Sequence, residues 1–160
     1  MTIDGRETSY YEWLYAGMVD LKQQYAAIHR GTQVLQRLWY GFDEHHYYLR
    51  LDVAVEELAK LAPWTLEIAG SRGLAVRVTP AAQGLSAQLL GPSAAPLPCA
   101  LGRLIELAMP LDRLGLKEGD SLELAVTLSR SGDLLECYPS EGHFTLVASL
   151  AALQAQAWSA

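Results

Sequence analysis

Alternation of apolar and polar residues with a period of two is the feature that most constrains this chain. In the clearest run, residues 120–129, Leu122, Leu124, Val126 and Leu128 alternate with polar or small residues. This pattern is typical of a half-buried β-strand. The same period recurs at residues 64–68, 74–78, 85–89, 105–109 and 144–146. The chain is therefore predicted to be rich in strands, although its many Leu and Ala residues favour helices by propensity alone.

Residues 34–53 predict a β-hairpin. Two alternating runs flank the turn sequence Asp43-Glu44-His45-His46. The side chains expected to face the core are Val34, Leu38, Tyr40 and Phe42 before the turn, and Tyr47, Leu49, Leu51 and Val53 after it.

Turn residues follow one another at short intervals, which favours an antiparallel arrangement over alternating βαβ units. The fold class predicted is all-β, a two-layer antiparallel sandwich formed by a single domain over residues 1–160. A few short helices are expected at residues 55–61, 111–114 and 149–158, the second of them ended by Gly115. The segment Gly91 to Pro98 holds three of the seven prolines and is interpreted as a loop.

Composition limits the class of partner. Of the 160 residues 51% are hydrophobic and 19% are charged, which excludes a disordered chain, and the net charge is −6. Phosphate contacts need clustered Lys and Arg, so nucleic acid and anionic membranes are not expected partners. No apolar run approaches the length of a membrane span and no signal peptide is evident, so we expect a cytoplasmic protein.

Cys99 and Cys137 are the two cysteines. They are too few for a disulfide framework and lack metal-ligand spacing. Two free thiols are the favoured interpretation, and a single disulfide is the alternative.

The usual local signatures of catalysis are missing. The chain has no glycine-rich phosphate loop, HExxH, GxSxG or paired CxxC motif, so no catalytic residue and no cofactor is assigned. Asp43, Glu44 and Asp52 flank the predicted hairpin and could supply oxygen ligands to Ca²⁺, although acidic turns commonly serve solubility alone.

Aromatic residues give the strongest indication of a ligand. Tyr11, Trp13 and Tyr15 would share one face of a strand, and Trp39 would point away from the core because Tyr40 points into it. An aromatic ring beside hydrogen-bonding groups suits the apolar face and hydroxyl rim of a sugar. The alternative for each of these rings is core packing.

Four segments resemble the C-terminal region of bacterial glycoside hydrolase family 57 proteins. They are Ser9-Tyr10-Tyr11-Glu12-Trp13-Leu14-Tyr15-Ala16-Gly17, Ile28-His29-Arg30, and the pair Arg37-Leu38-Trp39-Tyr40-Gly41-Phe42-Asp43 with Tyr48-Leu49-Arg50-Leu51-Asp52. The later stretch 105–120 is similar to the strand, Pro, short helix and LG-x-x-x-GD pattern of family 9 carbohydrate-binding modules and DOMON-like sandwiches. Leu135-Glu136-Cys137-Tyr138-Pro139 resembles the closing element of that superfamily.

The resemblance implies a parent α-glucan-acting enzyme whose catalytic carboxylates lie in an upstream barrel of several hundred residues. This chain is too short to hold that barrel, so we expect a non-catalytic C-terminal accessory domain that holds α-glucan or an oligosaccharide near the catalytic domain. The alternative is a structural sandwich that packs on that domain without binding sugar. An independent enzyme is the third and least favoured hypothesis.

Overall fold

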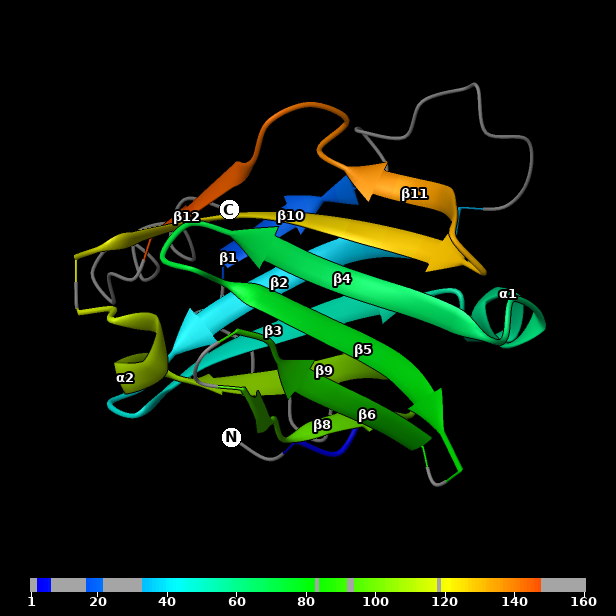
Figure 1. Cartoon of the computed structure of the whole chain (residues 1–160), viewed down its shortest axis with the longest axis horizontal. Coiled ribbons are helices and arrows are strands. Elements are labelled where there is room, and N and C mark those ends of the chain that lie inside the picture. The colour runs from blue at the N-terminus through cyan, green and yellow to red at the C-terminus, as the bar shows by residue number, and fades with distance from the viewer. Residues whose placement is uncertain are drawn as a thin grey trace.

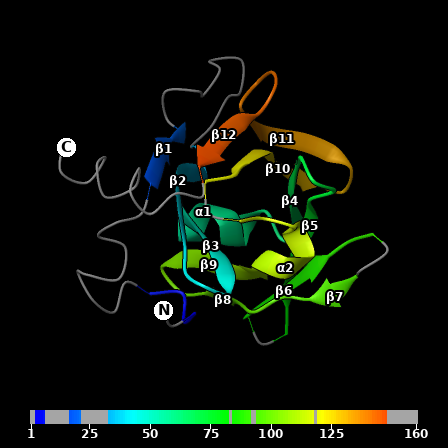
Figure 2. The same ribbon diagram turned by 90° about the vertical axis from the view of Figure 1, so that its left-hand side faces the viewer.

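The computed structural model describes residues 3–6, 17–21, 33–82, 84–91, 94–117 and 119–147. Within them, a five-stranded sheet and a seven-stranded sheet, both antiparallel, pack face to face (Figure 1), and the turned view in Figure 2 shows the two layers from the side. Sheet A contains β1 (Gly17–Asp20), β2 (Leu35–Phe42), β3 (His46–Val53), β9 (Leu104–Pro110) and β8 (Cys99–Leu101), in that spatial order. Sheet B contains β11 (Asp133–Tyr138), β10 (Ser121–Arg130), β4 (Trp64–Gly70), β5 (Ala75–Ala81), β6 (Gly84–Leu89) and β7 (Ala95–Pro96), with β12 (Phe144–Val147) also on β10. The predicted two-layer sandwich is confirmed.

The alternating residues predicted to face inward do form the core. In the hairpin, Leu38, Tyr47, Leu49 and Leu51 are at most 1% exposed, and they pack against residues of sheet B in one buried cluster. The four apolar residues of β10 are fully buried in the same cluster. Burying an aliphatic side chain is worth about 1.5–3 kcal/mol, so the contact between the inner faces is what holds the two layers together.

Both short helices that fall within the described residues form where they are predicted. They are α1 (Val55–Lys60) and α2 (Leu111–Leu114). Gly115 ends α2 in the left-handed conformation, with φ of 63°, which glycine adopts without strain. The helix predicted at 149–158 lies outside the described residues. Residues 91–98 were predicted as loop only, but they include the two-residue strand β7, which pairs with β6.

Glu136 ties the two sheets together at one end of the sandwich. Its side chain is 5% exposed, on β11 of sheet B, yet its carboxylate accepts the backbone N–H groups of Val34 (2.8 Å) and Leu35 (3.1 Å) at the start of β2 in sheet A. The hydroxyl of Tyr138 donates a third hydrogen bond at 2.8 Å. A buried carboxylate is stable when donors surround it in this way, so Glu136 acts as a polar link inside an apolar core.

The two cysteines lie on different sheets. Cys99 is on β8 at an edge of sheet A and Cys137 is on β11 in sheet B, and both thiols are free. Burial raises the pKa of the Cys99 thiol, which lies 3.6 Å from the carbonyl oxygen of Leu85. The favoured expectation of free thiols therefore holds in this fold, and the disulfide alternative does not.

No helix among the described residues has both the length and the apolar character needed to cross a bilayer.

Candidate functional site

The outer face of sheet A carries charged and aromatic side chains in two rows that cross the strands. In one row, Trp39 on β2 lies opposite Arg50 on β3, which lies opposite Glu106 on β9. In the next row, Arg37 on β2 lies opposite Asp52 on β3. These positions alternate with the core residues of the same strands, so strand pairing alone brings five functional side chains onto one face.

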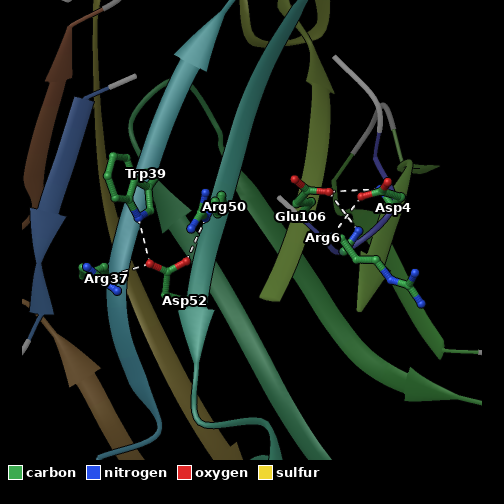
Figure 3. Close-up of polar contacts among 8 residues, drawn as sticks. Asp4, Arg6, Arg37, Trp39, Arg50, Asp52 and Glu106 are labelled. Atoms are coloured by element: carbon green, nitrogen blue, oxygen red, sulfur yellow. Dashed lines mark hydrogen bonds and ion pairs between the residues drawn. The ribbon is translucent and has the colours of Figure 1, made fainter. Parts of the chain in front are cut away.

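Asp52 connects the two rows. Its Oδ2 accepts the indole N–H of Trp39 at 2.9 Å and lies 3.0 Å from Nε of Arg37, while its Oδ1 accepts Nε–H of Arg50 at 2.8 Å (Figure 3). Charge-assisted hydrogen bonds of this length fix both the carboxylate and its partners. The side chains therefore reach their positions before any ligand arrives.

Arg50 is the most enclosed cation of this group. It is 7% exposed, and its guanidinium carbon lies 5.1 Å from the centre of the Trp39 ring, within range of a cation–π interaction. Asp52, itself 8% exposed, supplies the negative charge that a buried arginine needs. One face of the Trp39 ring is thus taken by Arg50.

Glu106 holds the N-terminal segment against the same face. Its carboxylate is fully buried, and Oε2 accepts the N–H groups of Asp4 (3.0 Å) and Gly5 (2.9 Å) (Figure 3). The carbonyl of Gly5 accepts the N–H of Arg103 at 2.9 Å. Gly5 has a φ of +75°, and a Cβ on it would lie 2.3 Å from the backbone nitrogen of Gly102, so this close approach requires glycine.

A groove of about 690 Å³ opens where these elements meet, and we call it the arginine groove. Its size lies within the usual range for small-molecule sites. The residues that line it are Arg6, Gln36, Arg37, Arg50, Asp52, Val53, Gly102, Arg103 and Leu104. They come from the N-terminal segment, β2, β3 and the turn between β8 and β9, so the site exists only in the folded sheet.

Comparison with known proteins adds nothing to this geometry. No family model, curated protein or solved structure matches the chain. Any function assigned to the groove must therefore be argued from its own residues.

Of the four aromatic residues predicted to bind sugar, the structure describes Trp39. As predicted, it lies on the face opposite Tyr40, which belongs to the core. Trp39 is half-buried, packs against the cluster of Tyr48 and Ala108, and donates its indole N–H to Asp52, which lines the arginine groove. Tyr11, Trp13 and Tyr15 lie outside the described residues.

Asp43, Glu44 and Asp52 do not form the calcium site considered for them. Asp43 is in the turn before β3, whereas Asp52 is six residues beyond His46, roughly 20 Å along the strand at about 3.3 Å per residue. Asp52 is also already bound to two arginines. Among the described residues, no group of three His, Cys, Asp or Glu side chains could hold a metal ion.

Asp43 instead stabilises the hairpin turn. Its Oδ1 accepts the N–H groups of His45 (2.8 Å) and His46 (2.9 Å), and its Oδ2 accepts the Tyr48 hydroxyl at 2.6 Å. Burial opposes ionisation, but the hydrogen bonds from Tyr48, His45 and His46, aided by the charge of His46, outweigh it and lower the pKa of Asp43 to about 2. Burial, followed by the hydrogen bond to Asp43 and its negative charge, raises the pKa of Tyr48 to about 12.

The Asp43→Asn variant is expected to change two titrations. Because the pKa of Asp43 is lower in the folded than in the unfolded state, its ionised form stabilises the protein above pH 4, and that contribution is lost as the pH falls from about 4 to 2. The variant should therefore lose less stability over this interval than the wild type, and the pKa of Tyr48 should fall because the neighbouring negative charge is gone. Urea unfolding between pH 2 and pH 5, and NMR of tyrosine ring carbons at high pH, measure the two effects.

A matched control is Glu44→Gln, which removes the same charge from the same turn at a side chain that forms no hydrogen bond with a described residue. An unchanged Tyr48 titration in Asp43→Asn would contradict the proposed coupling.

The arginines of the groove were missed by sequence reasoning. Arg37, Arg50 and Asp52 occupy outward-facing positions of the predicted hairpin, which marks them only as exposed residues. The usable signal was that the outward positions of both strands carry opposite charges beside a Trp. Nothing in the sequence indicated that Arg6 and Arg103, about a hundred residues apart, would join them.

Proposed function

We propose that this chain is a non-catalytic accessory domain that binds carbohydrate on the outer face of sheet A, as expected for the C-terminal part of a glycoside hydrolase family 57 enzyme acting on α-glucan. The observation that carries the proposal is the arginine groove, whose Asp52 is hydrogen-bonded to the indole of Trp39. Planar polar side chains fixed by one another beside an aromatic ring suit sugar hydroxyls and the sugar's apolar face. On this proposal the catalytic domain of the parent chain is the protein partner, and the setting is cytoplasmic.

The carboxylates at the groove favour binding over hydrolysis. Hydrolysis of a glycosidic bond uses two carboxyl groups about 5–9.5 Å apart, one of them protonated. Among the described residues that line the groove, Asp52 is the single carboxylate, and both of its oxygens bind Arg or Trp side chains. Asp52 is thus a positioning group for its neighbours.

A second candidate function is a structural sandwich that packs on the catalytic domain. Met18 on edge strand β1 is 45% exposed and lies opposite Trp39 in the strand register. An exposed apolar side chain beside a tryptophan is also a common feature of protein interfaces. Sugar binding by the isolated chain distinguishes the two candidates.

Titration with maltooligosaccharides followed by NMR tests the carbohydrate proposal. We expect millimolar maltotetraose to shift the Trp39 indole N–H signal and the backbone signals of Arg50, and to leave the indole of Trp64 unchanged because Trp64 is 2% exposed in the core. Trp39→Ala should weaken binding about fivefold, since a stacked ring contributes roughly 1 kcal/mol beyond area burial.

The predicted contribution of the other rings is tested by Trp13→Ala in the same titration. If no signal moves at millimolar maltotetraose in the wild type, α-glucan binding is wrong and the structural candidate remains.

A further inference from the structure

We propose that the ligand of the arginine groove is an acidic saccharide, a sugar that carries a carboxylate or a phosphoryl group. This inference rests on the proposed carbohydrate function and specifies its ligand class. It comes from a charge distribution that the sequence alone did not indicate.

The charge of the groove lining is opposite in sign to the net charge of the chain. The protein has 12 basic and 18 acidic residues, yet among the described residues four basic side chains line this groove with a single carboxylate. All four are arginine and none is lysine. The guanidinium group offers paired N–H donors in a plane, which match the two oxygens of a carboxylate or phosphoryl group. A neutral sugar needs no such concentration of positive charge.

Two of the arginines are held in place before a ligand binds. Asp52 accepts Nε–H of Arg50 and pairs with Nε of Arg37, which orients both guanidinium planes on one side of the sheet (Figure 3). Arg50 is 7% exposed and the Arg37 side chain is 44% exposed. Arg50 therefore forms an enclosed floor and Arg37 an accessible rim. Preorganisation of this kind lowers the entropy lost on binding.

The other two arginines come from the segments joined by Glu106. Arg6 follows Gly5, whose N–H binds Glu106, and Arg103 donates its own N–H to the carbonyl of Gly5. Both side chains are exposed, and neither forms an ion pair with a described residue. In Figure 3, Arg37 and the backbone of Arg6 lie on opposite sides of Arg50, and the Arg6 guanidinium extends away from Asp52.

The described acidic residues Glu106 and Asp4, near the groove, already accept hydrogen bonds from backbone N–H groups. Glu106 is fully buried and accepts two backbone N–H groups, and Asp4 accepts the N–H of Arg6. Asp20, the register partner of Arg37, is not among the residues that line the groove. Among the described residues that line the groove, four guanidinium groups stand against one carboxylate, so an anionic group meets an excess of positive charge there.

Calorimetric titration of the full chain at low ionic strength with four probes tests the inference. The probes are glucose, glucuronate, glucose 6-phosphate and inorganic phosphate. We expect one or both acidic sugars to bind at least about tenfold more tightly than glucose and than inorganic phosphate, and this advantage to shrink as salt is raised. Comparison of the two acidic sugars shows which anionic group is preferred.

Single substitutions test which arginines contribute to the affinity for the acidic sugar. Arg37→Gln and Arg103→Gln should each lower the affinity for the preferred acidic sugar about tenfold. The matched control is Arg77→Gln on sheet B, an arginine whose side chain is 52% exposed and paired with Glu67, and it should leave every affinity unchanged. Circular dichroism confirms that each variant keeps its strand content.

The outcomes separate this inference from the proposed function. Equal binding of glucose and both acidic sugars overturns the acidic ligand and leaves carbohydrate binding in place. Inorganic phosphate bound as tightly as either acidic sugar overturns the saccharide part and reduces the groove to an anion site. Absence of binding by all four probes, together with maltotetraose, overturns both proposals.

Discussion

Replacing Glu136 with alanine is expected to lower the free energy of unfolding by about 3–5 kcal/mol. The carboxylate is buried between the sheets and accepts hydrogen bonds from the N–H groups of Val34 and Leu35 and from the hydroxyl of Tyr138. Alanine removes the acceptor of the Val34 and Leu35 N–H groups in an apolar region, where each such group costs roughly 1–3 kcal/mol, and it also removes one hydrogen bond of Tyr138. Urea unfolding followed by far-UV circular dichroism measures the loss.

Glu67→Ala is the matched control for Glu136→Ala. Glu67 is also a strand residue of sheet B, but its side chain is 46% exposed and it forms one ion pair, with Arg77 at 3.3 Å. A surface pair is worth about 0–1 kcal/mol, so the control should change stability little. Glu136→Gln should fall between the two, because it keeps one acceptor oxygen. Equal losses for Glu136→Ala and Glu67→Ala would contradict the role assigned to Glu136.

Glu106→Ala is expected to cost about 2–3 kcal/mol and to release the N-terminal segment from sheet A. The variant removes the acceptor for the N–H groups of Asp4 and Gly5, and it takes away the negative charge that lies opposite Arg50 in the register. Amide hydrogen exchange should accelerate at Asp4, Gly5 and Arg103, and urea unfolding gives the change in stability.

The control for Glu106→Ala is Glu44→Ala, in the exposed turn of the same sheet. It removes an acidic side chain that lies on the surface, and we expect a change within about 0.5 kcal/mol. If exchange at Gly5 is as slow in Glu106→Ala as in the wild type, contacts other than this carboxylate hold the segment.

The strands that sequence reasoning predicted share one property, which is a run of at least two inward apolar residues separated by polar ones. β10 and β3 satisfy it over their whole length, whereas β2 departs from it at a bulge between Leu35 and Arg37. Gly115 marks the end of α2 because the chain there needs a positive φ. The strands β1, β7, β8 and β11 were not predicted. β7 and β8 have two and three residues, too few to show a period, and neither GMVD in β1 nor DLLECY in β11 alternates apolar with polar residues.

Only the part of the candidate site that follows from alternation within one strand could be predicted. Alternation places Trp39 outside the core, but it cannot say that β3 pairs with β9 or that residues 3–6 lie over Glu106. Those contacts depend on strand register and on chain segments far apart in the sequence. Local periodicity carries no information about them.

The two buried carboxylates also limit which contacts can form while the chain is being synthesised. Glu106 and Glu136 each bind backbone N–H groups that lie 101 and 102 positions earlier in the chain. During translation, the segment around Gly5 and the start of β2 must therefore wait for their acceptors until the ribosome has added about a hundred more residues. Contacts of such long sequence separation slow folding. A nascent chain that stops before Glu136 leaves the N–H groups of Val34 and Leu35 bonded to water, and without β11 and β12 sheet B is incomplete, so part of the apolar inner face of sheet A stays exposed.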